Sequence, residues 1–428
     1  MAASHPDLTS SQPLSLEERG FFGAARLLAP RLNSVWGVAL LTALGYGAFA
    51  VARWLWLGGD VSRFVIAGEF ILPQAGAAVG LSVAPHAAGY DGQFYYLLAL
   101  NPFSPHPALP GARYDLPAYR AQRILYPLLV WALSLGGQPA LVPWLLVIVN
   151  LAAITAIGAL AAALARRRGV APLWGLTLAL YPGLLVGLAS DLGDPLALAC
   201  ALGGLLCVSK KRWGWAALLL SLAALARETT LALAAALLLA ALLARFVARW
   251  RLFPRADWRG GALAGAIPLA VALVWQVVLA LRWGEAGIFA AGANNVGVPL
   301  VGIFEGLALW SRLGQLALAL VSYSVVAYLV CMTETARRWL GRLAPIDIGG
   351  WGYLALAWGL YVALALTLSL NVWDYFWNFL RGAAELGMLS ALIALAAPLR
   401  VRQVALGATL ALWLVCFLAI APVARPAL

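Results

Sequence analysis

The carboxylate of Asp91 stands in a sequence context that could do chemistry. Asp91 belongs to the aromatic run Tyr-Asp-Gly-Gln-Phe-Tyr-Tyr at residues 90–96, and Asn101-Pro102 follows five residues later. We expect a short helix that begins at Asp91 and ends before Asn101, with its apolar side chains on a membrane surface. A carboxylate at the polar start of such a helix could act as a general base on a hydroxyl group. The alternative is that Asp91 only caps the helix.

Two arginines further along could hold an anion. Arg120 and Arg123 lie three residues apart, next to Tyr119, so a helix would place both guanidinium groups on one face. Such a pair could bind a phosphate through charge-assisted hydrogen bonds. The alternative is that each arginine extends toward lipid headgroups.

Further charged residues interrupt or border apolar stretches. Asp191 and Asp194 lie in one short turn. We expect them to face the same side and to line a cavity or bind a cation, although Asp194 could simply cap the next helix. Arg227 and Glu228 separate two short apolar stretches, either as functional groups below the membrane surface or as a mutually neutralised structural pair. Arg381, after an aromatic stretch, adds a candidate anion contact.

The composition shows which elements must position these residues. Of the 428 residues, 64% are hydrophobic and 11% charged, and the mean hydropathy is +0.89, which excludes a water-soluble enzyme. The apolar stretches are about 18 to 25 residues long, enough to cross a membrane as helices. The net charge of +12 comes from clusters between these stretches and therefore indicates topology rather than nucleic-acid binding. We predict an all-α polytopic membrane protein.

Apolar stretches and basic clusters together predict eleven transmembrane helices. With the N-terminus in the cytoplasm, every basic cluster falls on the cytoplasmic side and the C-terminus lies outside. The apolar stretch 124–135 is too short to cross, and we interpret it as an interfacial or re-entrant helix in the first external loop. The predicted spans are about 34–56, 139–164, 172–190, 195–209, 213–226, 229–247, 262–282, 314–333, 351–371, 382–399 and 404–422.

This topology predicts a domain organisation and the side of the site. Residues 1–33 form a cytoplasmic tail, and residues 34–428 form a single transmembrane domain whose first external loop, 57–137, carries Asp91. The candidate acids and arginines named above all fall at or near the outer face. The sequence therefore predicts an extracytoplasmic polar site.

Three motifs in this order resemble a known family. They are Tyr-Asp-Gly-Gln-Phe-Tyr at 90–95, Leu-Tyr-Pro-Leu at 125–128 and Ala-Arg-Glu-Thr at 226–229. The pattern resembles the GT-C superfamily, polytopic glycosyltransferases that use polyprenyl-phosphate sugars. It looks closest to bacterial relatives of the mannosyltransferase of GPI-anchor assembly. Tyr90 stands where that family has Trp, and the residues after Arg227 also depart from the family pattern.

The resemblance implies an inverting transfer of a sugar, with mannose as one candidate, to a glycan, lipid or protein acceptor for cell-envelope assembly. Asp91 would be the catalytic base, and Arg120, Arg123, Arg227 or Arg381 would hold the donor phosphate. The other implied substrate-binding positions are Tyr90, Gln93, Tyr95, Asp191, Asp194 and Glu228. The protein would lie in a bacterial inner or plasma membrane.

A divalent metal between Asp91 and Asp191 or Asp194 is an alternative seen in some superfamily members, but the nearer relatives work without one and we expect no cofactor. Two other functions stay open: a transporter or flippase of lipid-linked sugars, which predicts inverted repeats that we do not see clearly, and a non-catalytic scaffold of the same fold. The glycine-rich segment 284–314 could close over substrate or be a plain loop.

Overall fold

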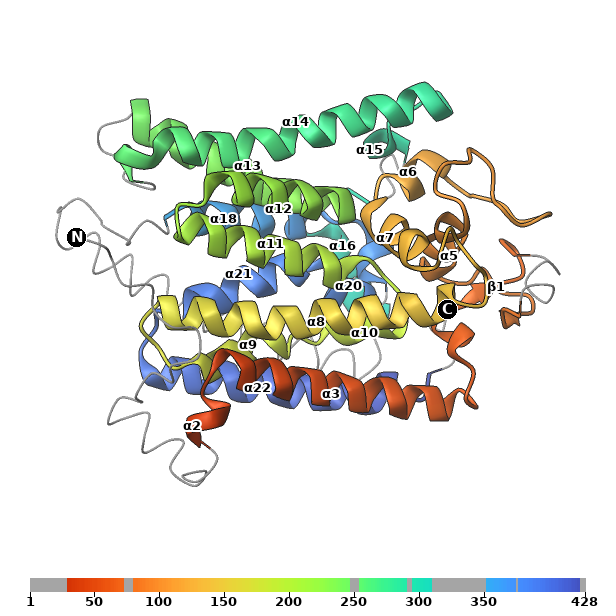
Figure 1. Ribbon diagram of the computed structural model, residues 1–428, viewed down its shortest axis with the longest axis horizontal. Helices are drawn as coiled ribbons and strands as arrows, with labels where there is room; N and C mark the ends of the chain where they lie inside the picture. Colours follow the sequence, from red (N-terminus) through yellow and green to blue (C-terminus); the bar gives the residue numbers. More distant parts are fainter. Residues whose placement is uncertain are drawn as a thin grey trace.

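The computed structural model describes residues 29–72, 80–246, 254–290, 295–309, 352–374 and 376–423. Over these residues the protein is mainly helical (Figure 1). The two strands found there, β1 (Ala67–Gly68) and β2 (Val83–Ala84), pair in parallel over two residues each. The prediction of an all-α fold is therefore confirmed.

The elements lie along the chain in the following order. The α-helices are α2 (Ala29–Leu32), α3 (Val35–Trp56), α5 (Gly92–Leu100), α6 (Pro117–Ala121), α7 (Leu125–Leu133), α8 (Val142–Arg167), α9 (Leu176–Ala179), α10 (Gly183–Ala189), α11 (Asp194–Ser209), α12 (Trp213–Ala226), α13 (Leu231–Phe246), α14 (Trp258–Trp283), α15 (Gly287–Ala290), α16 (Val301–Leu309), α18 (Gly352–Thr367), α19 (Leu370–Trp373), α20 (Phe376–Gly382), α21 (Ala384–Ala394) and α22 (Leu399–Ile420). Single turns of 3₁₀ helix are η2 (Val61–Phe64), η3 (Pro172–Gly175), η4 (Glu228–Thr230) and η5 (Arg255–Asp257).

Five helical segments among the described residues are long and apolar enough to cross a membrane. They are α3, α8, η4 with α13, α14 and α22, and each has 19 to 26 residues. A sixth crossing is formed if Pro172–Ala179 and Gly183–Ala189, which meet at 59°, act as one broken span. At about 1.5 Å per residue, the two 26-residue helices reach about 39 Å. These helices are compatible with a multi-pass membrane protein.

Four of the eleven predicted spans correspond to shorter apolar helices. At 11 to 16 residues, each is about 16 to 24 Å long, less than the hydrocarbon thickness of about 30 Å. The predicted span 314–333 lies outside the described residues. The four shorter helices are α11, α12, α18 and α21.

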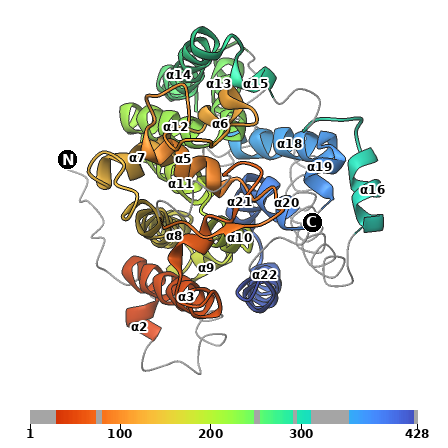
Figure 2. The same ribbon diagram turned by 90° about the vertical axis from the view of Figure 1, so that its right-hand side faces the viewer.

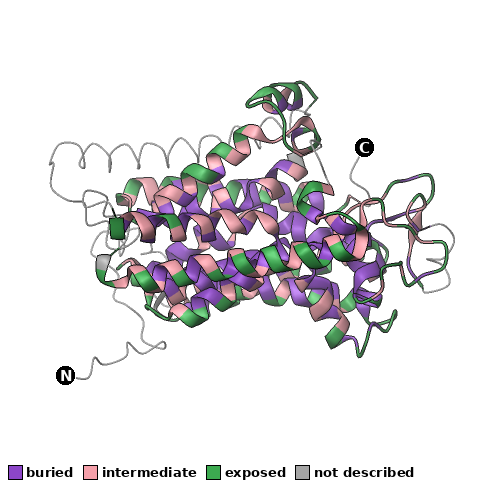
Figure 3. Ribbon diagram, turned by 90° about the horizontal axis from the view of Figure 1, so that it is seen from above, coloured by how far each residue is buried: buried purple, intermediate pink, exposed green. Residues whose placement is uncertain are grey.

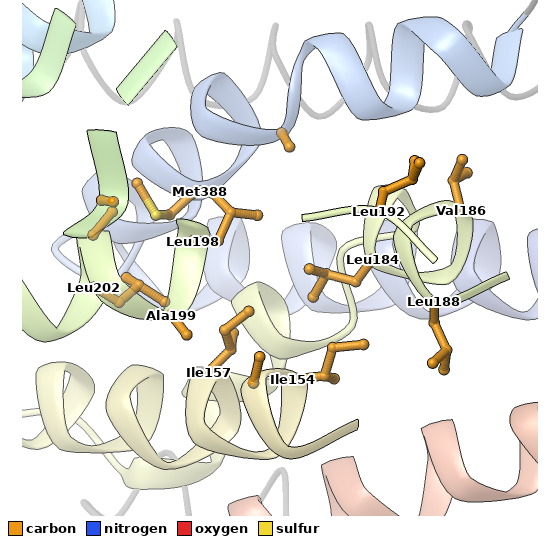
Figure 4. Close-up of a cluster of buried hydrophobic side chains, with 14 of the residues drawn as sticks. Ile154, Ile157, Leu184, Val186, Leu188, Leu192, Leu198, Ala199, Leu202 and Met388 are labelled. Carbon is orange, nitrogen blue, oxygen red and sulfur yellow. The ribbon is translucent and has the colours of Figure 1, made fainter. Parts of the chain in front are cut away.

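Small residues allow the helices to pack closely. An added Cβ on Gly265 of α14 would lie 2.7 Å from the carbonyl oxygen of Ala234 in α13, so these two backbones touch. Figure 4 shows apolar side chains from α8, α10, α11 and α21 meeting in one buried cluster. The outward faces of the long helices are exposed (Figure 3). Large apolar side chains lie on them, among them Leu273 and Leu281 of α14. This pattern fits contact with lipid.

The short helices α5, α6 and α7 gather at one end of the long helices, together with β1 (Figures 1 and 2). The expectation that α5 lies on a membrane surface is wrong, because all nine of its residues, including Phe94, Leu97 and Leu98, are buried. They pack against α7 and α8. The nine residues of α7 form a helix that is too short to cross a membrane, as predicted.

Candidate functional site

Nine charged side chains form a continuous network at the end of the molecule that carries α5 and α6. We call it the ion-pair cluster. Each member is joined to the next by hydrogen bonds or by contacts between charged groups of at most 4.0 Å. The cluster consists of Asp91, Asp115, Arg120, Arg123, Asp194, Arg227, Glu228, Arg381 and Glu385.

Asp91 lies at the centre of the cluster, immediately before α5. Its side chain makes no capping hydrogen bond to that helix, so the alternative of a simple cap is not supported. Instead, Arg120 Nη1 donates to Oδ1 at 2.6 Å and Arg381 Nη1 donates to Oδ2 at 2.5 Å. Arg123 Nη1 lies 4.0 Å from Oδ2. Three guanidinium groups therefore surround one carboxylate.

Each of these arginines also has a second carboxylate partner. Arg120 donates to both oxygens of Asp115, at 2.9 and 2.5 Å. Arg123 donates to both oxygens of Glu228, at 2.8 and 2.5 Å. Bidentate pairs of this kind fix the orientation of the guanidinium plane.

Arg120 lies on α6, and Arg123 lies in the turn that follows this helix. Pro117 begins α6, and the backbone turn that follows brings both side chains to Asp91, as expected from their spacing. The C-terminal part of α14 holds this turn in place, because Trp275 Nε1 donates to the carbonyl oxygen of Ala121 at 3.3 Å. Helix α15 packs on α6 so closely that a Cβ on Gly287 would lie 2.5 Å from the carbonyl oxygen of Ala118.

Arg381 connects the centre of the cluster to a deeper part. Its Nε donates to Asp194 Oδ2 at 3.0 Å, while Nη1 binds Asp91. Arg227 Nη1 forms a close ion pair with Asp194, and Arg227 Nε lies 3.1 Å from Glu385 Oε1. The side chains of Asp194 and Glu385 are only 4% and 1% exposed, against 20% for Asp91. The cluster is therefore buried around Asp194 and Glu385 and more open to solvent around Asp91.

The arginines control the ionisation of Asp91. Burial alone would raise the pKa of this carboxyl group, but the charges of Arg381, Arg120 and Arg123 outweigh the loss of solvation and hold the pKa well below its ordinary value. Asp91 is therefore ionised and strongly paired in this structure.

The aromatic and amide residues next to Asp91 have different surroundings. Tyr90 lies beside the cluster: its ring is 6.0 Å from the Arg381 guanidinium carbon, and its hydroxyl donates to Asn378 Oδ1 at 2.5 Å. The ring of Tyr95 packs edge-on against Tyr126. Gln93 is directed elsewhere, because its amide binds the main chain of Gly68 and Ala88 and is buried. The geometry gives Gln93 a structural role.

Asp191 does not join Asp194 in the cluster, so the expectation that they face the same side is wrong. Asp191 is fully buried, with φ at 48°, and this left-handed residue turns the chain between the two carboxylates. Neither carboxylate oxygen of Asp191 has a hydrogen-bond partner among the described residues. The positive charge of buried Arg53 acts on Asp191, while the Arg53 side chain itself donates to the carbonyl oxygens of Ala189, Ile420 and Val423.

Four residues near Asp91 were not among the predicted site positions. Asp115 and Glu385 complete the ion pairs, Thr229 Oγ1 lies between Arg227 and Glu385, and Asn378 binds Tyr90. Sequence spacing could have pointed to Glu385. It follows Arg381 by four residues, and residues at that spacing are neighbours on one face of a helix. Nothing comparable points to Asn378, whose partner is distant in the sequence.

The described residues contain no group of three or more His, Cys, Asp or Glu side chains placed to hold a metal ion. The carboxylates of Asp91 and Asp194, one of the two pairs considered for a metal, are bridged by the Arg381 guanidinium. A cation between them would meet that positive charge.

Besides the packing of α15 on α6, the glycine-rich segment reaches the site through Asn295. Asn295 Nδ2 donates to the hydroxyl of Tyr119 at 3.2 Å, and Arg123 Nη2 donates to the same hydroxyl at 3.1 Å. Residues 291–294 and 310–314 of this segment lie outside the described residues.

Fold and site together define a helical protein with long apolar helices and a paired arginine–carboxylate cluster at one end. No protein-family model, curated protein or solved structure matches the chain.

Proposed function

We propose that this protein is a membrane glycosyltransferase of the GT-C type, which moves a sugar from a polyprenyl-phosphate donor to an acceptor hydroxyl. The observation that carries the proposal is the position of Asp91 among Arg120, Arg123 and Arg381. These residues lie at the end of the molecule where α5 and α6 gather beside the long apolar helices (Figure 1). A carboxylate able to take a proton and guanidinium groups able to hold a phosphate therefore lie side by side. The apolar helices would accommodate the polyprenyl chain.

The proposed reaction is a single inverting displacement. The acceptor oxygen forms a bond to the anomeric carbon of the sugar, and the bond from that carbon to the phosphate oxygen breaks. The hydroxyl proton passes to the carboxylate of Asp91, and the electron pair of the broken bond leaves with the lipid phosphate. Positive groups positioned in advance around that phosphate stabilise its developing charge. Asp91 then releases its proton to water.

The arginines divide between two tasks. Arg120, Arg123 and Arg381 surround the more open carboxylate and would hold the phosphate. Arg227 lies deeper, paired with Asp194 and Glu385, and we assign it to positioning Arg381 through Asp194. This assignment narrows the four candidates suggested by the sequence to three.

The proposed function also includes the number of membrane spans and the side of the membrane on which the cluster lies. Eleven spans with the N-terminus in the cytoplasm would place the cluster on the extracytoplasmic face of a bacterial inner or plasma membrane. The four shorter helices would then cross at places where the bilayer is locally thinned. The acceptor would be a glycan, lipid or protein of the cell envelope.

The test is transfer of radiolabelled sugar by the purified protein in liposomes, from a panel of polyprenyl-phosphate sugars that includes the mannose compound. We expect labelled product from at least one donor and none from protein-free liposomes. Absence of product from every donor, with labelled lipid nevertheless crossing the bilayer, would favour a transporter.

A further inference from the structure

Asp91 is the only carboxylate shared by three arginines of the ion-pair cluster, as far as the described residues show. Arg120 and Arg381 bind one oxygen each, and Arg123 lies 4.0 Å away. Both oxygens are therefore engaged. In this arrangement Asp91 is a weak base, since its negative charge is already stabilised by neighbouring positive charge.

The same pairing leaves no net positive charge for an incoming phosphate. The ion-pair cluster contains five carboxylates and four guanidinium groups. An anion that enters while all these pairs persist meets a site without excess positive charge. Phosphate binding therefore requires that a carboxylate give up its arginines.

Asp91 is the carboxylate best placed to do so. Each arginine around it retains a second acidic partner: Asp115 for Arg120, Glu228 for Arg123 and Asp194 for Arg381. These partners would keep the guanidinium groups in position if Asp91 moved away. Asp91 itself is 20% exposed, and no capping hydrogen bond ties it to α5.

We infer that a phosphate group replaces Asp91 on Arg120, Arg123 and Arg381, and that this exchange releases Asp91 to act as a base. The inference rests on the proposed function and adds an order of events, in which the phosphate-bearing substrate binds before the acceptor hydroxyl is deprotonated. The site then becomes reactive only when the donor is in place. The recognised chemistry is a phosphate monoester or diester.

The exchange makes an unusual prediction for binding. Removing the negative charge of Asp91 removes a competitor of the phosphate, so Asp91→Asn should bind a polyprenyl monophosphate without sugar more tightly than the wild type. We expect the dissociation constant to fall about tenfold, the change that corresponds to about 1.4 kcal/mol. If Asp91 instead served to position the arginines, the same variant would bind more weakly.

The measurement is equilibrium binding to the full-length protein in lipid nanodiscs, with thermal melting to verify that each variant is folded. Asp91→Ser provides a second neutral variant in case Asp91→Asn does not fold. The matched control is Asp257→Asn, which removes a carboxylate paired with Lys211 at the opposite end of α14 from α6. Its affinity should equal that of the wild type.

The outcomes separate this inference from the proposed function. Tighter binding in either folded Asp91 variant supports the exchange, and a parallel series with inorganic phosphate shows whether the free ion is recognised or only the lipid-linked group. Unchanged or weaker binding in the Asp91 variants, with a wild type that binds and transfers, overturns the exchange but leaves the transferase. A wild type that binds no polyprenyl phosphate overturns both.

Discussion

At the scale of single residues, Arg381 connects the open and buried parts of the ion-pair cluster. It is the one described side chain that binds both Asp91 and Asp194, residues that lie far apart in the sequence. Its removal would leave each carboxylate with fewer positive neighbours in a poorly solvated place. Loss of one partner from a buried ion pair is costly because the remaining charge stays buried.

We therefore predict that Arg381→Gln lowers the stability of the folded protein by about 3 kcal/mol. The measurement is the melting temperature in detergent at a fixed scan rate. The matched control is Arg63→Gln, since Arg63 is 49% exposed and lies 3.6 Å from Asp60, where an ion pair contributes about 0 to 1 kcal/mol. Equal melting temperatures for the two variants would contradict the bridging role of Arg381.

The residue types of the site were largely predictable from the sequence, whereas their pairing was not. Carboxylates and arginines at the ends of apolar stretches are costly unless they interact, so Asp91, Arg120, Arg227 and Arg381 could be selected without a structure. Which arginine meets which acid depends on tertiary packing: Arg381 lies on α20, whereas its partner Asp91 precedes α5. The main-chain partners of the Gln93 amide could not be predicted either, because they lie in a loop that no periodicity reveals.

At the scale of elements, the start of α5 is fixed by a close approach to the turn before α11. A Cβ on Gly92 would clash with the carbonyl oxygen of Ser190 and lie 2.7 Å from that of Val65. Only glycine fits between these two backbones, which places Asp91 next to the segment that carries Asp194. The sequence could not show this contact, since the two segments are distant along the chain.

Gly92→Ala should therefore displace Asp91 from its arginines and lower the transfer rate by about 100-fold, the order of loss expected for a misplacement of about 1 Å. The rate is measured with the same donor and acceptor as for the wild type. Gly47→Ala in α3 is the control, because no atom lies within 4 Å of the added Cβ. A Gly92→Ala protein with the wild-type rate would show that this contact does not position the base.

Transmembrane helices could be predicted from the sequence where an apolar stretch was also long enough to cross a membrane. The predicted spans at 34–56 and 404–422 correspond to α3 and α22, both of which meet the length and hydropathy expected for a crossing helix. The prediction was wrong for α5, where aromatic side chains that suggested a membrane surface are buried against α7 and α8. Aromatic residues suit both surroundings, and the sequence alone does not distinguish them.

At the scale of the whole molecule, the ion-pair cluster and the basic ends of the helices lie at opposite ends of the long helices. Lys211 follows α11, whereas Asp194 begins the same helix, so the length of α11 separates them. In the proposed topology, which follows the positive-inside rule, the Lys211 end would lie in the cytoplasm and the cluster outside. The direction in which the helices cross the membrane therefore decides on which side of the membrane the ion-pair cluster lies.

We predict that His106→Cys, in the exposed loop near α6, reacts with a membrane-impermeant maleimide added to intact cells. Lys211→Cys should react only after the membrane is permeabilised. Both substitutions are made in a protein lacking its four native cysteines, so that labelling reports a single position. Labelling of Lys211→Cys in intact cells, with His106→Cys protected, would invert the proposed topology.

The most direct test of the account is sugar transfer by wild type and Asp91→Asn, purified and reconstituted side by side in liposomes with the donor found active in the panel. Loss of a general base lowers such rates by about 10² to 10⁴-fold, and we predict a loss in this range for a variant that still melts cooperatively and still binds polyprenyl phosphate. Transfer at the wild-type rate by folded Asp91→Asn would contradict the assignment of Asp91 as the base and, with it, the proposed mechanism.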